Sequence, residues 1–519
     1  MKEKLLGKNT GRALKQVGFS TLELMIAFAL ISIVLTGALQ GNFAAQYWTQ
    51  VSRTSNEGLY KTKTELEDLR SLIKQDFYGA VSKPRAASVD VSDPADQSCI
   101  DGGLCYFVET NITDISSCSK FVEAKVDWQV NNYPRTESAL YTNLTNSQEI
   151  INRGGDCILN TPNGNWKDNS PLSVGTISNT PGKQFTSIDV LHRKIYATTN
   201  TVPSFYVYDI PTGIGTSPVA VGSYDLKLNG FSVKINAIDV EQDLSTGRTY
   251  AFVAVATTTK QLSVFDVTDS HNPDLKTQVT LQNVDQFGSY PQGYRLYIYG
   301  QRLYITLRET LGTEFHIFDI STPTLPTEIG NGFELNRTVN DLIVREQKVG
   351  SVLKRLAFIA SDSNLKELAV LDVSGDTVSE INSVDLPGIQ DGLSISLVGN
   401  NLFLGRSSNA VGPELYVFNI TNSATSLPII GQGEVSSDVS SIKVSGDYAY
   451  LGTNRIGEEI QIWDSKYLNW NPGTLNSGRF NSYNFGNLSP LGFDIDGDWI
   501  YGISNLASTD KIQVLYTTP

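Results

Sequence analysis

Apolar residues run almost without interruption from Phe19 to Leu39, a stretch long enough to cross the hydrocarbon core of a bilayer as a helix. One acid, Glu23, lies near the start of this run, where an unpaired carboxylate would cost a few kcal/mol, so it needs a partner. Further apolar residues recur at spacings of three, four and seven: Leu59, Leu66, Leu69, Ile73 and Phe77. The pattern predicts one helix of about 60 residues that ends at Gly79 and the Ser82-Lys83-Pro84 sequence.

Short segments of alternating apolar and polar residues follow the predicted helix. They are Ala87–Val91, Leu104–Glu109, Phe121–Val130 and Ser138–Thr142. In the third segment, Val122, Ala124, Val126 and Trp128 alternate with polar residues, which is typical of a strand with one buried face. We therefore expect residues 81–160 to form a small antiparallel sheet packed on the half of the helix outside the membrane. Residues 161–184 are rich in Asn, Pro, Gly and Ser, and this composition predicts a linker.

The remaining residues, 185–519, repeat one hairpin of two alternating strands joined by a tight polar turn. Clear copies are Ile188–Ala197, Leu296–Ile305, Ile395–Leu404, Ile442–Leu451 and Phe493–Gly502. Copies with longer turns lie near 237–256 and 341–360. Repetition of one supersecondary unit predicts an architecture in which each unit buries its faces against its neighbours.

A second repeated segment, an apolar strand ending in Asp or Asn, follows six of the hairpins. Its terminal residues are Asp209, Asp266, Asp319, Asp372, Asn419 and Asp464, at separations of 57, 53, 53, 47 and 45 residues. This period is typical of the four-stranded blades of a β-propeller, so we expect seven blades. The last blade, from Leu491, has three evident strands, and residues 172–177 are expected to supply the fourth. We also expect these Asp side chains to accept hydrogen bonds from the turns that follow them.

The junction between the basic leader and the apolar run has a distinctive sequence. Lys15-Gln16-Val17-Gly18-Phe19-Ser20-Thr21-Leu22-Glu23 resembles the class III signal of bacterial type IV prepilins and pseudopilins. The resemblance implies that a prepilin peptidase in the membrane cuts between Gly18 and Phe19 and methylates the new amino terminus. It also implies that Glu23 meets the amine of a neighbouring pilin subunit during assembly.

Two simpler interpretations of the same residues fit less well. An ordinary secretory signal would place a small-residue cleavage site after the apolar run, whereas here Gly18 precedes it and an acid lies inside it. A plain membrane anchor explains the length of the run but not Glu23.

The charge of the chain restricts its partners. The formal net charge is −14, and removal of residues 1–18 would take away five positive charges and one negative charge, leaving −18. Nucleic acid is excluded as a partner, because binding phosphates requires a basic face. Charged residues make up only 18% of the chain, and Ser, Thr, Asn and Gly are abundant, a composition that suits a surface protein.

All four cysteines, Cys99, Cys105, Cys118 and Cys157, lie in the predicted sheet domain. An even number in one small domain of an exported chain favours two disulfides, for which three connectivities exist. Our working pairing joins Cys99 to Cys105 and Cys118 to Cys157. A zinc site is the alternative, but it would need short paired spacings and a nearby histidine, and the nearest, His192, lies outside this domain.

The sequence carries no recognisable catalytic pattern. The three histidines, His192, His271 and His316, have no His or Cys at metal-ligand spacing, and phosphate-binding loops and a GxSxG elbow are absent. Asp494, Asp496 and Asp498 suggest a calcium loop, but the same position in other repeats is an ordinary hairpin turn, and we favour the turn. The aromatic residues of the blades are better explained as core than as a sugar-binding platform. We therefore expect no enzyme activity, no cofactor and no metal.

The blades resemble the LVIVD-type surface propellers, most plainly in Val264-Phe265-Asp266-Val267-Thr268 and Ile317-Phe318-Asp319-Ile320-Ser321. The predicted fold is an α+β pilin module, a long N-terminal helix plus an antiparallel sheet, followed by an all-β seven-bladed propeller. The predicted parts are a leader at 1–18, the transmembrane and assembly helix at 19–80, the sheet at 81–160, the linker at 161–184 and the propeller at 185–519.

These expectations combine into one functional hypothesis. The chain would be held in the bacterial inner membrane by one helix, enter an extracellular or periplasmic fibre as a minor pilin, and display the propeller for adhesion to a surface protein or glycan. The alternative is a pseudopilin of a type II-like secretion system whose propeller binds an exported substrate or partner pilins.

Overall fold

The computed structural model describes most of the chain. The described residues are 21–87, 105–129, 136–158, 164–178, 184–210, 216–284, 291–308, 311–408, 412–467, 470–471, 473–486, 490–504 and 511–518. They form two compact units, one containing Met1–Glu65, Lys83–Glu109 and Ala124–Leu140, and the other Leu66–Ser82, Thr110–Glu123 and Tyr141–Pro519.

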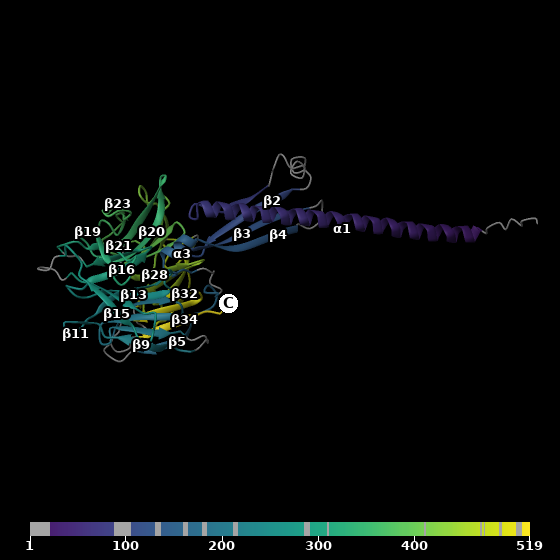
Figure 1. Cartoon of the computed structure of the whole chain (residues 1–519). Helices are drawn as coiled ribbons and strands as arrows, with labels where there is room; N and C mark the ends of the chain where they lie inside the picture. The colour runs from purple at the N-terminus through teal and green to yellow at the C-terminus, as the bar shows by residue number, and fades with distance from the viewer. Residues whose placement is uncertain are drawn as a thin grey trace, which may run out of the picture. The chain divides into compact units, whose positions relative to one another are not determined.

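The predicted long helix is confirmed as α1, which spans Thr21–Gln75 (Figure 1). Glu23 lies in its first turn and Lys74 in its last, so both charges oppose the helix dipole favourably. Among the described residues, α1 is the one helix long and apolar enough to cross a membrane, and its most apolar stretch of 18 residues is fully exposed. The exposed apolar half therefore needs an environment other than water.

The helix contacts the first sheet through a glycine. A Cβ added to Gly58 would lie 2.2 Å from the ring of Trp128, so glycine is what allows this close approach. Leu66, Leu69 and Ile73 are buried as their spacing predicts. Leu59, however, is 49% exposed, and its expected burial is wrong because the adjacent position supplies the contact with Trp128.

Four strands form the predicted antiparallel sheet, in the order β1-β2-β3-β4. They are β1 (Lys83–Ala87), β2 (Tyr106–Asp114), β3 (Ser119–Trp128) and β4 (Thr136–Thr145). The alternating residues of β3 from Val122 to Trp128 are buried, as predicted. Helix α1 ends at Gln75, before the expected break at Ser82-Lys83-Pro84, and β1 begins within that sequence at Lys83; Pro84 is tolerated there since β1 is an edge strand. Most of the predicted strand at Ala87–Val91 lies outside the described residues.

A short helix that the sequence analysis did not predict, α3, follows β4 and spans Ser147–Asn152. The Asn146 side chain caps it by accepting a hydrogen bond of 3.2 Å from the Glu149 backbone N–H. Six residues are too few for an apolar periodicity to be visible in the sequence.

The repeats form seven four-stranded antiparallel sheets in the described part of the chain. In chain order they are β6 (Phe185–Leu191), β7 (Lys194–Thr199), β8 (Phe205–Asp209) and β9 (Val219–Tyr224); β12 (Ile235–Asp243), β13 (Arg248–Val255), β14 (Leu262–Asp266) and β15 (Asp274–Val279); β16 (Gly293–Tyr299), β17 (Arg302–Leu307), β18 (Phe315–Asp319) and β19 (Thr327–Phe333); β20 (Val339–Val349), β21 (Val352–Ser361), β22 (Leu368–Asp372) and β23 (Ser379–Val384); β24 (Gly392–Val398), β25 (Asn401–Arg406), β26 (Leu415–Asn419) and β27 (Ile429–Gly433); β28 (Val439–Ser445), β29 (Tyr448–Thr453), β30 (Ile460–Asp464) and β31 (Arg479–Tyr483); and β32 (Pro490–Asp496), β33 (Trp499–Ser504), β34 (Lys511–Tyr516) and β5 (Leu172–Ser178). A separate two-stranded ribbon joins β10 (Lys227–Leu228) to β11 (Phe231–Ser232).

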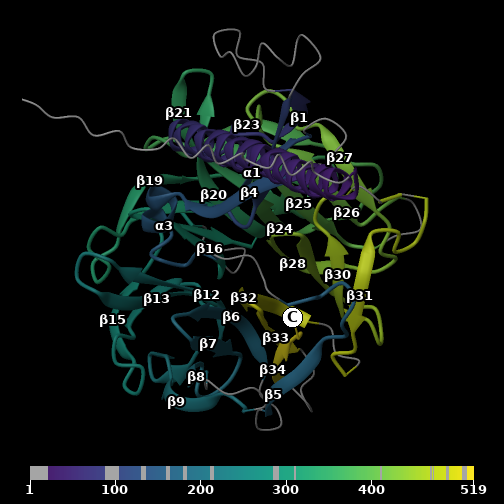
Figure 2. The same cartoon turned by 90° about the vertical axis from the view of Figure 1, so that its right-hand side faces the viewer.

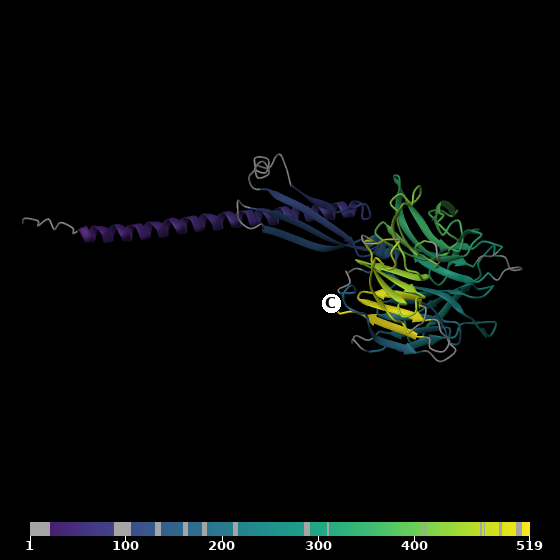
Figure 3. The ribbon, with the colours of Figure 1, turned by 180° about the vertical axis from the view of Figure 1, so that it is seen from behind.

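The seven sheets close into a ring, so the predicted propeller is confirmed. The first strand of each sheet contacts the first strand of the next, and β32 contacts β6 to complete the circle (Figure 2). The predicted closing strand is also confirmed: β5 pairs antiparallel with β34, from Leu172 opposite Tyr516 to Ser178 opposite Lys511 (Figure 3). Each sheet thereby has four strands, and both of its faces are buried against neighbouring sheets.

Two polar positions recur in the blades. The predicted Asx turns are confirmed, since the carboxylates of Asp266, Asp319 and Asp372 accept the backbone N–H two residues later at 3.1, 2.8 and 3.1 Å. A second position, directly before the third strand, holds a buried acceptor for a backbone N–H after the fourth strand. The acceptors are Ser204, Gln261, Glu314, Glu367, Glu414 and Glu459.

The compact units divide the chain differently from the predicted domains, because residues 141–519 lie in one unit. The predicted linker at 161–184 contains β5 and the fully buried Trp166, whose ring lies edge-on 5.4 Å from that of Tyr450. Parts of the predicted sheet domain, 110–123 and 141–158, also belong to the propeller's unit. Trp166, a large apolar residue within a polar segment, was the feature of the sequence that indicated packing of this segment against the propeller.

Candidate functional site

The first strands of the seven blades surround a cavity of about 270 Å³ on the propeller axis. The lining surface is more polar than apolar, and its residues come from every blade. Corresponding positions in the blades hold Asp189, Asp239, Tyr297, Ile343, Ser396, Lys443 and Asp494. Because this position varies between blades, the cavity is chemically asymmetric although its walls are repeats.

Four carboxylates in this cavity tie neighbouring blades together. Each accepts a hydrogen bond from a backbone N–H of the next blade's first strand. The pairs are Asp494 with Val190 at 2.9 Å, Asp189 with Val240 at 2.6 Å, Asp239 with Ile298 at 2.8 Å, and Asp341 with Ile395 at 2.9 Å. The axial acids therefore hold the ring together, and this role was not recognised from the sequence.

Burial dominates the electrostatics of the cavity. It raises the pKa of Asp239 to about 7, while the N–H of Ile298 acts in the opposite direction. The pKa values of Asp189 and Asp341 are raised for the same reason. Burial by itself would lower the pKa of Lys443, but the carboxylates of Asp494 and Asp156 raise it above its ordinary value. Asp494 lies 3.0 Å from the Lys443 ammonium, so this cation compensates part of the acidic charge.

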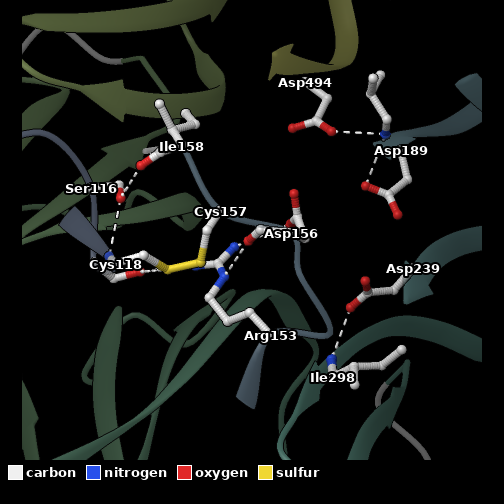
Figure 4. A network of polar contacts seen from close by, with 12 residues as sticks. Ser116, Cys118, Arg153, Asp156, Cys157, Ile158, Asp189, Asp239, Ile298 and Asp494 are labelled. Atoms are coloured by element: carbon white, nitrogen blue, oxygen red, sulfur yellow. Dashed lines mark hydrogen bonds and ion pairs between the residues drawn. A yellow bond between two sulfur atoms is a disulfide. The ribbon is translucent and has the colours of Figure 1, made fainter. Parts of the chain in front are cut away.

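One end of the cavity is closed by a plug, which we define as residues 116–118 and 153–158. Cys118 and Cys157 form a disulfide with 5.9 Å between their Cα atoms, as our working pairing predicted (Figure 4). The Ser116 hydroxyl donates a hydrogen bond of 2.7 Å to the Ile158 carbonyl and accepts one of 3.0 Å from the Cys118 N–H. The disulfide thus joins two segments that are distant in sequence into one element.

The plug also contributes charge to the axis. Arg153 forms a salt bridge of 3.3 Å with Asp156, and Figure 4 shows Asp156 between the disulfide and the axial Asp189 and Asp494. Burial raises the pKa of Asp156, the cation of Arg153 lowers it, and the charge of Asp494 raises it again. Without Arg153 this segment would bring another uncompensated carboxylate to an acidic cavity.

Residues next to the plug in the chain attach it to the ends of the first strands where the hairpin turns lie. The Gly446 N–H donates to the Ile115 carbonyl at 2.9 Å, and the Gly300 N–H donates to the Asn152 carbonyl at 2.5 Å. The Tyr299 hydroxyl donates to the Glu149 carboxylate at 2.6 Å. These contacts place the covered end of the axis at the hairpin turns, opposite the end where the first strands begin.

The structure places the other predicted site residues separately. Gly18, Phe19 and Cys99 lie outside the described residues, so the cleavage site and the pairing of Cys99 with Cys105 stay predictions. Cys105 is in a disulfide. Glu23 is exposed in the first turn of α1.

The histidines do not come together. His192 lies in the β6–β7 turn, His271 lies in the segment after β14, and the buried His316 in β18 has Nδ1 2.7 Å from a Glu328 carboxylate oxygen. Asp494, Asp496 and Asp498 belong to the predicted β32–β33 hairpin, which is confirmed. The carboxylates of Asp494 and Asp498 have separate partners. Asp494 accepts the Val190 N–H and pairs with Lys443, and Asp498 accepts the Gly164 N–H at 3.1 Å. Among the described residues, no group of three or more His, Cys, Asp or Glu side chains is arranged to hold a metal ion.

The sequence reasoning missed the axial acids and the plug. Asp189 and Asp494 occupy the same place in the hairpin repeat, which was a visible signal, but Tyr297 and Lys443 occupy it in other blades. Arg153 and Asp156 lie in a segment without periodicity, so nothing in the sequence placed them on the axis. Chemically, the site offers hydrogen-bond acceptors and fixed charge in a cavity on the propeller axis.

Comparison with known proteins supports the propeller. A family model described as the LVIVD repeat matches residues 295–332 and 436–456, within the blades of β16–β19 and β28–β31. A comparison with curated proteins gave no match.

Among solved structures, this chain is similar to the WD40 repeats of RRP9 (11% identity, TM-score 0.44, covering 67% of this chain and 99% of that one). It is also similar to the periplasmic gluconolactonase of Pseudomonas aeruginosa (11% identity, TM-score 0.42, covering 74% and 98%). At these scores the likenesses add nothing to the architecture that the strand pairing already establishes. The chain therefore contains a β-propeller with LVIVD-repeat segments, preceded by a long N-terminal helix that is apolar enough to anchor it in a membrane.

Proposed function

We propose that this protein is a pilin-like subunit whose N-terminal helix is held first in the inner membrane and then among neighbouring subunits of a fibre, and whose propeller recognises a surface. One observation carries the proposal: the first half of α1 exposes a continuous set of large apolar side chains. Examples are Leu22, Met25, Phe28, Ile33 and Val34, which are 67%, 71%, 63%, 68% and 70% exposed. Such a surface is stable only in lipid or against other apolar helices.

The position of Glu23 supports assembly rather than simple anchoring. An acid in the first turn of a membrane helix is costly unless an opposite charge compensates it. The resemblance to prepilins supplies that charge, since cleavage after Gly18 would leave an amine on Phe19 and each subunit would carry both partners. Glu23 would then pair with the amine of the adjacent subunit, and the pair would set the axial register of the helices.

We assign recognition to the propeller, without catalysis. The four axial carboxylates are already used as acceptors for backbone N–H groups, and the Asp494 carboxylate is also paired with Lys443. Groups committed in this way favour a rigid scaffold. A rigid ring that presents loops at the end away from the plug is suited to binding a target.

The experiment compares three strains of the native host: wild type, Glu23→Val, and the control Glu67→Val, which removes an exposed acid elsewhere on α1. Mass spectrometry identifies the amino-terminal residue of the mature protein. Immunogold labelling with an antibody to the propeller shows where the protein lies on the cell. We expect a terminus at Phe19 in all three strains and label on surface filaments in the wild type and the control alone.

An intact leader together with envelope label unchanged by Glu23→Val would overturn the proposal and leave a plain membrane anchor. Cleavage at Phe19 with label confined to the periplasm, and lost in Glu23→Val, would instead support the pseudopilin of a secretion system.

A further inference from the structure

We propose that the end of the axial cavity away from the plug binds an acidic sugar, whose carboxylate is held by Lys234, Arg295 and Arg308. This inference rests on the proposed recognition function and gives the chemical class of its ligand. It starts from a cluster of three cations that the sequence analysis did not single out.

The three cations meet at the beginning of β12 and β16. Arg295 and Arg308 both lie over the ring of Tyr294, with their guanidinium carbons 4.5 and 4.8 Å from its centroid. The Asn236 side chain donates a hydrogen bond of 2.7 Å to the Gly293 carbonyl, which brings the start of β12, and with it Lys234, beside the start of β16. The plug contacts the opposite ends of these strands, so the cluster lies at the end of the cavity away from the plug, where Arg295 is one of the lining residues.

The cluster holds more positive charge than its surroundings compensate. Among the described residues, neither Lys234 nor either arginine forms a salt bridge. Burial and then the charges of Arg308 and Arg295 lower the pKa of Lys234, as expected when like charges are held together. The Arg295 charge does act on Asp341, but that carboxylate already accepts the N–H groups of Leu342 and Ile395. In a chain with a net charge of −14, three such cations, of which Arg295 also lines the cavity, form a site for an anion.

The cavity behind the cluster distinguishes among anions. It is lined by Ser187, Ser396 and Ser441 and by the carboxylates of Asp239 and Asp341. Carboxylates accept hydrogen bonds from hydroxyl groups, but they repel a small multiply charged anion such as phosphate. A molecule with one carboxylate and several hydroxyl groups satisfies both regions, with its carboxylate on the arginines and its hydroxyl groups toward the acids. Acidic sugars have this chemistry, and a volume of about 270 Å³ admits one sugar unit.

The test is calorimetric titration of the full chain in detergent with D-glucuronate, D-galacturonate and N-acetylneuraminate. D-glucose and inorganic phosphate serve as comparison ligands. We expect at least one acidic sugar to bind saturably, and to bind at least about tenfold more tightly than glucose and phosphate.

Variants locate the site. Lys234→Gln and Arg308→Gln should each weaken binding about tenfold, because each removes a charge-assisted hydrogen bond. Lys227→Gln is the matched control, since this exposed lysine is already paired with Asp225 at 3.3 Å and should leave binding unchanged. Unchanged unfolding temperatures would show that the variants are folded.

Three outcomes would overturn the inference: no binding of any of the three acidic sugars, phosphate binding as tight as theirs, or equal binding by all variants. The outcomes of the processing and filament assays depend on residues 18–23 and not on the cation cluster of the propeller. Sugar binding can therefore fail while the proposed assembly function holds, and the reverse is also possible.

Discussion

The carboxylate of Asp494, in the last blade, accepts a hydrogen bond of 2.9 Å from the backbone N–H of Val190, in the first blade, although 304 residues separate them in the chain. This bond joins the first and last blades at the axis, while the pairing of β5 with β34 completes the opposite edge of the last blade. It is one of four axial bonds that join successive blades. We therefore expect the closure to depend on Asp494 more than on other acids of its hairpin.

Asp494→Ala should destabilise the propeller by about 1–3 kcal/mol, because it removes one of the two acceptors of the buried Val190 N–H, the other being Asp189 at 3.0 Å, and leaves Lys443 without its salt-bridge partner. Asp494→Asn should cost less, since the amide oxygen still accepts from Val190. Urea unfolding followed by tryptophan fluorescence measures the difference. Equal losses in the two variants would show that the hydrogen bond is not what matters.

The stability of the propeller should fall as pH rises through neutrality. Burial raises the pKa of Asp239 to about 7, so between its unfolded value near 4 and this folded value the native state binds more protons than the unfolded state. The free energy of unfolding therefore decreases from about pH 4 to about pH 7. Asp239→Asn removes this contribution, so the difference in unfolding temperature between pH 5 and pH 8 should shrink.

That difference should not vanish in Asp239→Asn, because the pKa values of Asp189 and Asp341 are raised in the same direction. Asp243→Asn is the control. Hydrogen bonds from Ser245 and Thr246 lower the pKa of Asp243, so it stays ionised in both states between pH 5 and pH 8. A difference that is the same in wild type and Asp239→Asn would contradict the role given to burial.

The disulfide of the plug should contribute to stability. It closes a loop with a sequence separation of 39, and replacing both Cys118 and Cys157 with serine should cost about 2–4 kcal/mol. Thermal unfolding under oxidising conditions measures the loss. A reductant should then lower the midpoint of the wild type more than that of the double variant, and equal midpoints for the two oxidised proteins would refute the prediction.

A buried acid that is repeated in the blades gives a prediction with an internal reference. The Glu459 carboxylate accepts a hydrogen bond of 2.8 Å from the Phe485 N–H, and Gln261 has the same place in another blade, where it accepts from Leu281 at 3.2 Å. Glu459→Ala should cost about 1–3 kcal/mol, whereas Glu459→Gln should be tolerated. Urea unfolding of the two variants decides this, and a glutamine variant as unstable as the alanine variant would argue that the charge itself is required.

Local patterns predicted the elements whose partners are close in sequence. The hairpins follow from strict alternation around short turns, and the Asx turns follow from Asp266 and its counterparts. The closing strand was predictable because a blade with three strands leaves an edge that must be paired. Each of these elements could be predicted from a pattern contained within a few neighbouring residues or within one repeat.

Features that depend on contacts between distant segments were not predictable. The plug is held in place because Ile115 and Asn152, beside it in the chain, bind hairpin turns more than a hundred residues away, and no periodicity predicts those contacts. Leu59 fitted the helical spacing, but the size of Trp128 makes Gly58 the contact residue instead. The cationic cluster of Lys234, Arg295 and Arg308 comes from two blades, so it becomes visible only when the ring order is known.

The pairing of β5 with β34 has a consequence for how the chain is made. If synthesis and export proceed from the amino terminus, β5 emerges before any other propeller strand, and its partner is the last strand of the chain. Until β34 arrives, the β5 backbone is an unpaired edge that could pair with another molecule. A chaperone that covers β5 would protect it during that interval, so correct closure depends on timing as well as on sequence.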